Sequence, residues 1–258
     1  MTLLEVESVS VNFGGLAALK RVGFAIGEGE IVGLIGPNGA GKTTLFNCLS
    51  GFLTPSEGRI RFRGTPVTGL APHQITALGM TRTFQTSRVF KRMTVMEHLL
   101  VGHHLHQRTG FWAAVLRPGW VGREEADALQ RGRQTLALFG EDLLPYLNDF
   151  ADALSYANKR RLEIARALVG EPRLLLLDEP TAGMNPRESA DVVELMRTIR
   201  KAGVTVLLIE HDMKVIMGIS DRIVVLDHGE KIAEGLPQEI RRNEDVIRAY
   251  MGRRHTGA

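Results

Sequence analysis

The sequence predicts an α/β fold in which helices cover a largely parallel sheet. Short apolar runs, typical of strands buried on both faces, lie at Ile31–Ile35, at Leu174–Leu177 within a strand expected at Arg173–Leu177, and at Val204–Ile209. Segments with helical spacing follow these runs, so strand and helix alternate along the chain. The chain has 258 residues, which is enough for one large domain with a substantial core.

The other elements are expected in three stretches of different character. The first third is mostly strand, with a helix from a Gly-rich loop to about Gly51 and strands at Leu3–Val11, Val22–Ile26 and Gly58–Arg63. The middle is helical, with Thr94–His106 and Glu124–Phe139 on either side of the aromatic stretch Phe111–Trp120. The last third alternates again, with helices at Pro186–Lys201 and Asp212–Met217 and strands at Arg222–Leu226 and Lys231–Glu234. We expect one domain over 1–258, with a core formed by 1–85 and 161–258 and a helical subdomain at about 86–160.

Composition excludes several classes of protein. A net charge of +3, from 32 basic and 29 acidic residues without a long basic run, does not suggest nucleic-acid binding. The single cysteine, Cys48, excludes an internal disulfide and fits a reducing compartment. Glu5 and Glu7 interrupt any signal peptide, and the apolar runs fall short of the ~20 residues of a membrane span. We therefore expect a cytoplasmic chain.

A Gly-rich loop between an apolar strand and a helix carries the strongest chemical signal. Its residues match G-x-x-x-x-G-K-[ST] and are Gly36, Pro37, Asn38, Gly39, Ala40, Gly41, Lys42, Thr43 and Thr44. Glycines let backbone N–H groups surround phosphate oxygens at a helix N-terminus. Lys42 would contact the β and γ phosphates, and the Thr43 hydroxyl would bind Mg²⁺. A chance Gly-rich turn is the alternative, and the strand–helix context disfavours it.

A carboxylate pair follows the apolar run Leu174–Leu177. Asp178 and Glu179 would place one acid near Mg²⁺ and its neighbour near a reacting water. Apolar strands often end in acids, so this pair indicates a catalytic site only when it is combined with the phosphate loop.

Nearly the whole chain resembles the ABC ATPase family of P-loop NTPases. Gln85, in Thr83-Phe84-Gln85, resembles the glutamine that touches Mg²⁺ and couples to the membrane partner. His211 resembles the switch histidine at the γ-phosphate, and Phe13 the aromatic that stacks on adenine. The resemblance implies ATP and Mg²⁺ as cofactors. It also implies an antiparallel β subdomain and an inserted helical subdomain on the parallel-sheet core.

The segment Leu154–Glu163 (LSYANKRRLE) is similar to the family signature LSGGQ-x-R-R, with substitutions. Leu154, Ser155 and Arg160 match, whereas Tyr156, Ala157 and Asn158 replace both glycines and the glutamine. In the family, this segment contacts ATP bound to the other subunit, so Ser155 is expected at that γ-phosphate. Ala157 would be strained only at positive φ. Asn185 replaces the usual aspartate of the loop after the carboxylates.

Three segments resemble the ATP-binding subunits of branched-chain amino-acid importers: Thr81–Leu100, Glu210–Asp221 and Asp245–Gly252. The resemblance implies transmembrane permease subunits as partners, a second ATP-binding subunit in a homo- or heterodimer and, indirectly, a substrate-binding protein. The chain would then lie peripherally on the inner face of the cell membrane, with Glu179, His211, Lys42, Gln85 and Ser155 catalytic.

Related urea/amide importers and lipopolysaccharide exporters share several of these segments and stay open as alternatives. A soluble ABC ATPase of translation or DNA repair is disfavoured by the single loop and the lack of a heptad run. The histidines of 98–106 suggest a metal site only weakly, and a solvated or partner-facing helix is the expected alternative.

Overall fold

The computed structural model describes residues 1–83, 89–104 and 119–251. Its strands are β1 (Thr2–Phe13), β2 (Leu16–Gly27), β3 (Ile31–Ile35), β4 (Glu57–Phe62), β5 (Thr65–Pro66), β6 (Met80–Arg82), β7 (Leu174–Asp178), β8 (Thr205–Ile209), β9 (Arg222–Asp227) and β10 (Glu230–Gly235). Its α-helices are α1 (Lys42–Leu49), α2 (Pro72–Ala77), α3 (Val95–His103), α5 (Gly119–Ala137), α6 (Tyr156–Leu168), α7 (Pro186–Lys201), α8 (Met213–Ile219), α9 (Pro237–Arg242) and α10 (Glu244–Met251).

The central sheet has six strands in the order β10-β9-β3-β8-β7-β6. All neighbouring strands pair in parallel except β10, which is antiparallel to β9. The three apolar runs form β3, β7 and β8 at the centre, with every residue buried. The expected parallel-sheet fold is thereby confirmed.

Alternate residues of each central strand enter two different hydrophobic cores, because successive side chains of a strand point to opposite faces. Val32, Leu176 and Leu207 pack into a core with α1 and the antiparallel sheet. Ile31, Leu175 and Val206 pack into the other core, against the helices of the opposite face. Burial on both faces explains why these strands read as continuous apolar runs.

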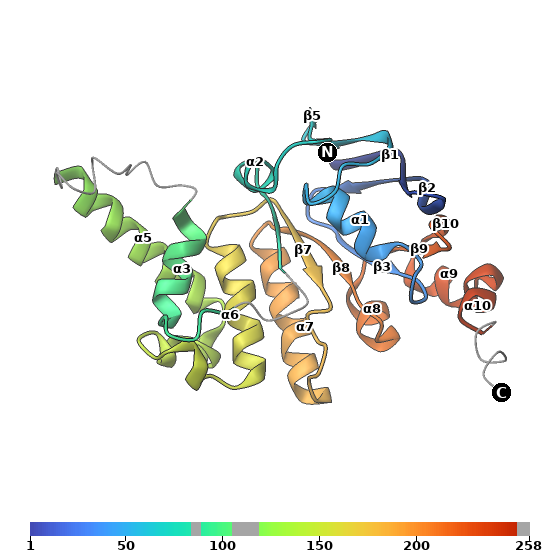
Figure 1. Ribbon diagram of the computed structural model, residues 1–258. Coiled ribbons are helices and arrows are strands. Elements are labelled where there is room, and N and C mark those ends of the chain that lie inside the picture. The colour runs from blue at the N-terminus through green and yellow to red at the C-terminus, as the bar shows by residue number, and fades with distance from the viewer. Residues whose placement is uncertain (84–88, 105–118, 252–258) are drawn as a thin grey trace.

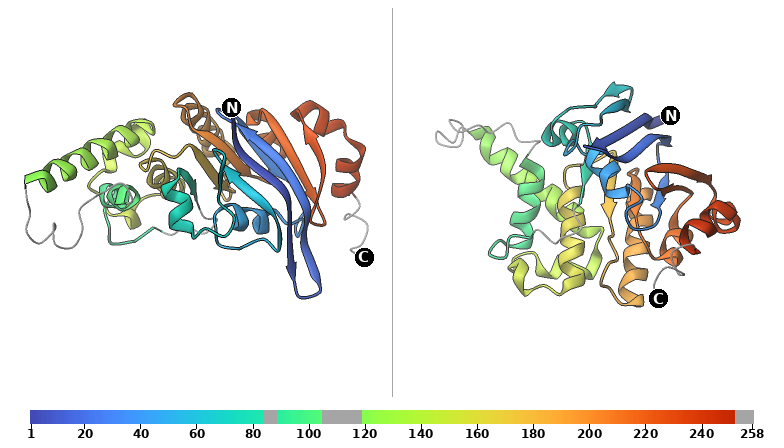
Figure 2. Two further views of the ribbon diagram at one scale, coloured as in Figure 1. Left: turned by 90° about the horizontal axis from the view of Figure 1, so that it is seen from above. Right: turned by 45° about the vertical axis from the view of Figure 1, so that its right-hand side comes forward.

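The second sheet is antiparallel, in the order β2-β1-β4-β5. Its long hairpin β1–β2 projects past the rest of the sheet (Figure 2). Gly14 occupies the left-handed region at the tip of the hairpin, with φ +56°, which glycine adopts readily. This sheet is the antiparallel β part that the resemblance implies.

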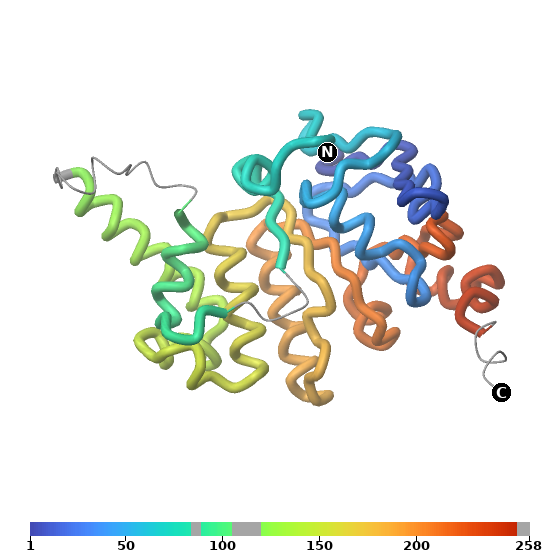
Figure 3. Tube along the Cα trace, in the orientation of Figure 1, coloured from blue at the N-terminus to red at the C-terminus, as the bar shows by residue number. Residues whose placement is uncertain are grey.

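Helices α3, α5 and α6 gather at one end of the molecule, away from α9 and α10 (Figure 1). The chain trace shows α6 returning from this group directly into β7 (Figure 3). The expected boundary near residue 160 falls inside α6, whose buried residues join those of α3 in one core. The division into a core and a helical subdomain stays a prediction.

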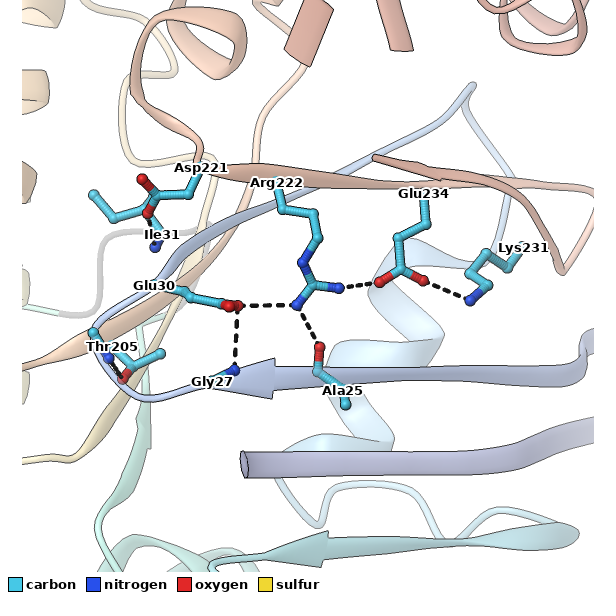
Figure 4. A network of polar contacts seen from close by, with 10 residues as sticks. Ala25, Gly27, Glu30, Ile31, Thr205, Asp221, Arg222, Lys231 and Glu234 are labelled. Carbon is cyan, nitrogen blue, oxygen red and sulfur yellow. Dashed lines mark hydrogen bonds and ion pairs between the residues drawn. The ribbon is translucent and has the colours of Figure 1, made fainter. Parts of the chain in front are cut away.

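A polar network joins the two sheets at the amino ends of the central strands (Figure 4). The Arg222 guanidinium on β9 donates to the Ala25 carbonyl of β2 at 2.6 Å and to Glu30 Oε2 at 2.9 Å, and it also pairs with Glu234 of β10. The Gly27 N–H donates to the same Glu30 oxygen at 3.2 Å. These bonds hold the antiparallel sheet at a set position against the parallel one.

The structure also differs from expectation at element ends. Strands β1 and β2 are longer than the apolar patterns indicated, because both also run through polar residues along the hairpin. Helices α2 and α9 are short and begin at a proline, and the sequence patterns did not indicate them. Across the described residues, no helix combines the length and apolar character that crossing a membrane requires.

Candidate functional site

The loop Gly36–Thr44 connects the carboxyl end of β3 to the start of α1, which begins at Lys42. The Lys42 ammonium donates to the loop carbonyls of Gly36 at 2.6 Å and Pro37 at 3.0 Å. The Gly229 N–H, in the β9–β10 turn, donates to the Ala40 carbonyl at 3.1 Å. The loop is therefore curled around the lysine and tied to a neighbouring turn.

Two glycines of this loop sit where no side chain fits. Gly36 has φ +152°, and a Cβ there would lie 2.1 Å from the Leu226 carbonyl oxygen. Gly41 has φ +100°, and a Cβ there would lie 2.7 Å from a methyl of Leu19. Gly39 has φ +81° with open space around it. The motif's first and last glycines thus permit close backbone packing as well as the turn.

An open cavity of about 720 Å³ lies over the loop. Its lining includes Asn38–Thr44, the exposed aromatic ring of Phe13, and Glu179. Phe13 is 52% exposed at the end of β1, so its ring face is available for stacking. The structure thus brings Phe13, the phosphate loop and Glu179 to one cavity.

Asp178 ends β7 and is buried, and its carboxylate pairs with Arg82 of the neighbouring strand β6. The distance from Arg82 Nη2 to Asp178 Oδ2 is 2.8 Å, and both side chains are about 5% exposed. No sequence pattern distinguishes Arg82, because an arginine at a strand end is ordinarily a surface residue.

Glu179 follows with φ +50°, a left-handed conformation that is uncommon for a residue with a side chain. Its N–H donates to the Ile209 carbonyl at 3.0 Å. His211 Nδ1 lies 3.4 Å from Glu179 Oε1, and the histidine itself is exposed. Such strain concentrates at functional sites, and here it accompanies the carboxylate expected to act on water.

Glu210, next to His211, was also overlooked. It is buried, and its Oε1 accepts hydrogen bonds from Thr181 N at 2.8 Å and Thr181 Oγ1 at 2.6 Å. Thr181 is two residues after Glu179, and Glu210 directly precedes His211, so these bonds tie the segment that carries Glu179 to the segment that carries His211. A charged residue directly after the apolar run of β8 was the available sequence signal.

Ser155 caps α6, its hydroxyl accepting from the Asn158 N–H at 3.2 Å. Ala157 is buried within the helix and is absent from the described residues with positive φ, so the substitution for glycine introduces no backbone strain. Asn158 accepts a hydrogen bond from Arg161 at 2.9 Å. Among the described residues that line the cavity, Ser155, Asp178 and His211 are not found.

The loop after Thr181 contacts Tyr156, in the segment Leu154–Glu163 that resembles the family signature. The Tyr156 hydroxyl donates to the Ala182 carbonyl at 3.2 Å, and its ring lies beside Gly183. Asn185 caps α7 and accepts from the N–H groups of Arg187 and Glu188, both at 3.0 Å. Asparagine caps a helix as well as aspartate does, so α7 keeps its cap despite the substitution.

The remaining candidates are resolved in part. Gln85 and His106 lie outside the described residues. His98 is buried, with Nε2 accepting from the Phe90 N–H at 2.9 Å and Nδ1 bonded to the Thr94 carbonyl at 2.8 Å, and His103 is also buried. These two histidines are therefore not solvated, and of the expected solvated or partner-facing helix the solvated alternative is wrong for them. No group of three or more metal-ligating side chains occurs in the described ranges.

Burial shifts the pKa of His98 and of Cys48. It lowers the pKa of His98, despite the bond to Thr94, and so keeps the ring neutral. Burial also raises the pKa of the Cys48 thiol to about 11, which makes this side chain a small hydrophobe rather than a nucleophile.

Comparison with known proteins agrees with this geometry. Residues 19–182 match the ABC transporter family model, and residues 230–256 match a model described as branched-chain amino acid ATP-binding cassette transporter. The chain is 49% identical over 251 residues to the high-affinity branched-chain amino acid transport ATP-binding protein LivG of Salmonella typhimurium, covering 97% of this chain and 98% of that protein. It is 47% identical to BraF of Pseudomonas aeruginosa, with the same coverage.

Among solved structures, the chain is similar to an ATP-binding cassette of an ABC transporter in its ADP conformation. The TM-score is 0.85 at 31% identity, with 98% of this chain and 99% of that chain covered. A nucleotide-free cassette gives a TM-score of 0.83, also at 31% identity, with 98% of this chain and 100% of that chain covered. The chain therefore belongs to the ABC transporter family, as one of its ATP-binding, ATP-hydrolysing subunits.

Proposed function

We propose that this subunit drives import of branched-chain amino acids. The observation that supports this choice of cargo is the 49% identity to LivG over 97% of the chain, together with the match at residues 230–256. Urea/amide importers and lipopolysaccharide exporters are the competing cargo classes, and that match favours the amino acids.

The donor set at the phosphate loop fits Mg²⁺, a hard cation that prefers oxygen ligands. The Thr43 hydroxyl is in the first turn of α1, which follows β3, and Asp178 ends β7, which β8 separates from β3 in the sheet. In this proposal these two residues, with Gln85, hold the cation. When bound, Mg²⁺ would neutralise charge on the β and γ phosphates.

The remaining roles belong to side chains around the cavity. Phe13 stacks on the adenine ring, and Lys42 exchanges its bonds to the Gly36 and Pro37 carbonyls for the phosphates. Glu179 orients and deprotonates the attacking water, and His211, 3.4 Å from Glu179, stabilises the γ-phosphate. Ser155 acts on ATP held by the partner chain, in agreement with its absence from the cavity lining among the described residues.

Two such chains, or this chain and a second ATP-binding subunit, would close head to tail over two ATP molecules. ATP binds the closed form better and so shifts the population toward it. The segment around Gln85–Leu100 would pass this motion to transmembrane permease subunits, which in turn receive cargo from a substrate-binding protein. We place the subunit on the cytoplasmic face of the membrane.

The test is affinity purification of the tagged chain from membranes, followed by reconstitution of the recovered complex in vesicles. We expect a permease and a second ATP-binding subunit to co-purify. Phosphate release should rise when binding protein loaded with leucine, isoleucine or valine is added, and not with urea. Recovery of a permease that transports another class of cargo would overturn the assignment.

A further inference from the structure

Arg82 joins two structural elements that carry separate halves of the proposed cation site. It lies at the end of β6, where it pairs with Leu176 of β7, two residues before Asp178. Its Nη2 donates to Asp178 Oδ2 at 2.8 Å. Its Nη1 donates to Asn47 Oδ1 at 2.7 Å and to Ser50 Oγ at 3.1 Å.

Asn47 belongs to α1, the helix that also carries Thr43, and Ser50 follows directly as its C-cap. The Arg82 guanidinium carbon lies 5.4 Å from the centre of the Phe46 ring, on the same helix. One planar group therefore contacts the strand that ends in Asp178 and the helix that begins beside Thr43. Lysine could not reproduce this arrangement, because a single ammonium cannot donate in two fixed directions from a plane.

Stability alone explains this ion pair poorly. Both side chains are buried, and a buried pair often contributes no more to stability than apolar residues of similar volume. A charge beside a carboxylate expected to bind a cation has a clear use, however, since partners of metal ligands fix the orientation of the ligands.

We propose that Arg82 is a positioning residue for the divalent-cation site, holding the Asp178 carboxylate in one orientation and at a set distance from α1 and Thr43. This inference rests on the proposed function, in which Asp178 and Thr43 bind Mg²⁺. It adds a third structural element, strand β6, to the site.

The experiment measures binding of a fluorescent ATP analogue to the full chain, in EDTA and over a Mg²⁺ titration. Arg82→Lys should raise the half-saturating Mg²⁺ concentration roughly tenfold, the loss typical of a removed partner of a metal ligand. Its affinity for the analogue in EDTA should stay within about twofold of wild type, because Arg82 does not line the nucleotide cavity.

Asn47→Ala serves as a milder variant, since it keeps the ion pair and removes only one bond to α1. It should raise the half-saturating concentration by roughly threefold. Arg222→Lys is the matched control, because Arg222 is also a multiply bonded arginine but lies at the opposite ends of the strands. It should leave the Mg²⁺ titration unchanged.

An unchanged Mg²⁺ titration in folded Arg82→Lys and in Asn47→Ala would overturn the inference. An equal loss of affinity in EDTA and in Mg²⁺ would also overturn it, because Arg82 would then support the nucleotide pocket as a whole. Should Arg82→Lys fail to fold, Asn47→Ala decides alone. Wild-type protein that shows no Mg²⁺ effect would instead refute the proposed cation site, so the two failures are distinguishable.

Discussion

Gly36→Ala is expected to damage both the stability of the chain and its affinity for nucleotide. The new methyl would lie 2.1 Å from the Leu226 carbonyl oxygen, far inside the 3.4 Å at which ordinary van der Waals contact begins. The backbone conformation costs a residue with a side chain about 1–2 kcal/mol, and the overpacking costs about 1–3 kcal/mol more. We therefore expect a loss of about 2–5 kcal/mol in the free energy of unfolding, a large part of a typical total.

Thermal unfolding followed by circular dichroism measures this loss, and a fall in Tm of about 10 °C is expected for a chain of this size. Gly64→Ala is the matched control, since Gly64 also has positive φ (+75°) but open space around it. It should lose only the conformational part, about 1–2 kcal/mol. Melting of the two variants within 2 °C of each other, together with wild-type ATP binding by Gly36→Ala, would show that Gly36 is not needed for close packing.

Three further predictions concern buried or altered positions. Burial lowers the pKa of His98 below the 6.5 of an unfolded histidine, so the unfolded state binds a proton more readily. Stability should therefore be full above pH 6.5 and decline below it, by up to about 1.4 kcal/mol per pH unit, and His98→Gln should show a shallower decline in urea unfolding at pH 5–7. Glu210→Ala leaves the Thr181 N–H and hydroxyl without their acceptor. It should lower the free energy of unfolding in urea by about 2–4 kcal/mol and abolish most phosphate release. Equal stability of Glu210→Ala and Glu210→Gln would contradict this prediction. Ala157→Gly should lower stability by about 0.5–1 kcal/mol without changing the ATPase rate, because the alanine is already helical; a faster variant would show that the altered signature limits hydrolysis.

Much of the fold could be predicted because the central strands are buried on both faces. Continuous apolar runs such as Ile31–Ile35 and Leu174–Leu177 indicate buried strands directly. The phosphate loop lies between a strand and a helix, as its motif requires. Helices α2 and α9 and the ends of the long hairpin β1–β2 could not be predicted this way. Each of the two helices has six residues, which is too short to show a helical period, and the ends of the hairpin run through polar residues.

The site shows the same division between local and distant signals. Lys42, Thr43, Asp178 and Glu179 lie in motifs whose spacing is set by one strand and the loop after it. Arg82 and Glu210 act through partners 96 and 29 residues away. Both lie in segments that resemble importer subunits, but no motif in those segments assigns either residue a role. Pairings of this kind depend on strand order in the sheet, which one sequence does not reveal.

The Glu179→Gln variant tests most directly whether Glu179 is the catalytic base and whether a partner chain completes the site. We expect it to bind ATP as tightly as wild type and to release phosphate at least ~100-fold more slowly. It should also form an ATP-dependent dimer in sedimentation that wild type forms only transiently. Hydrolysis near the wild-type rate would remove Glu179 as the catalytic base. A variant that binds ATP but stays monomeric, alone and with its second ATP-binding subunit, would contradict a site completed by a partner chain.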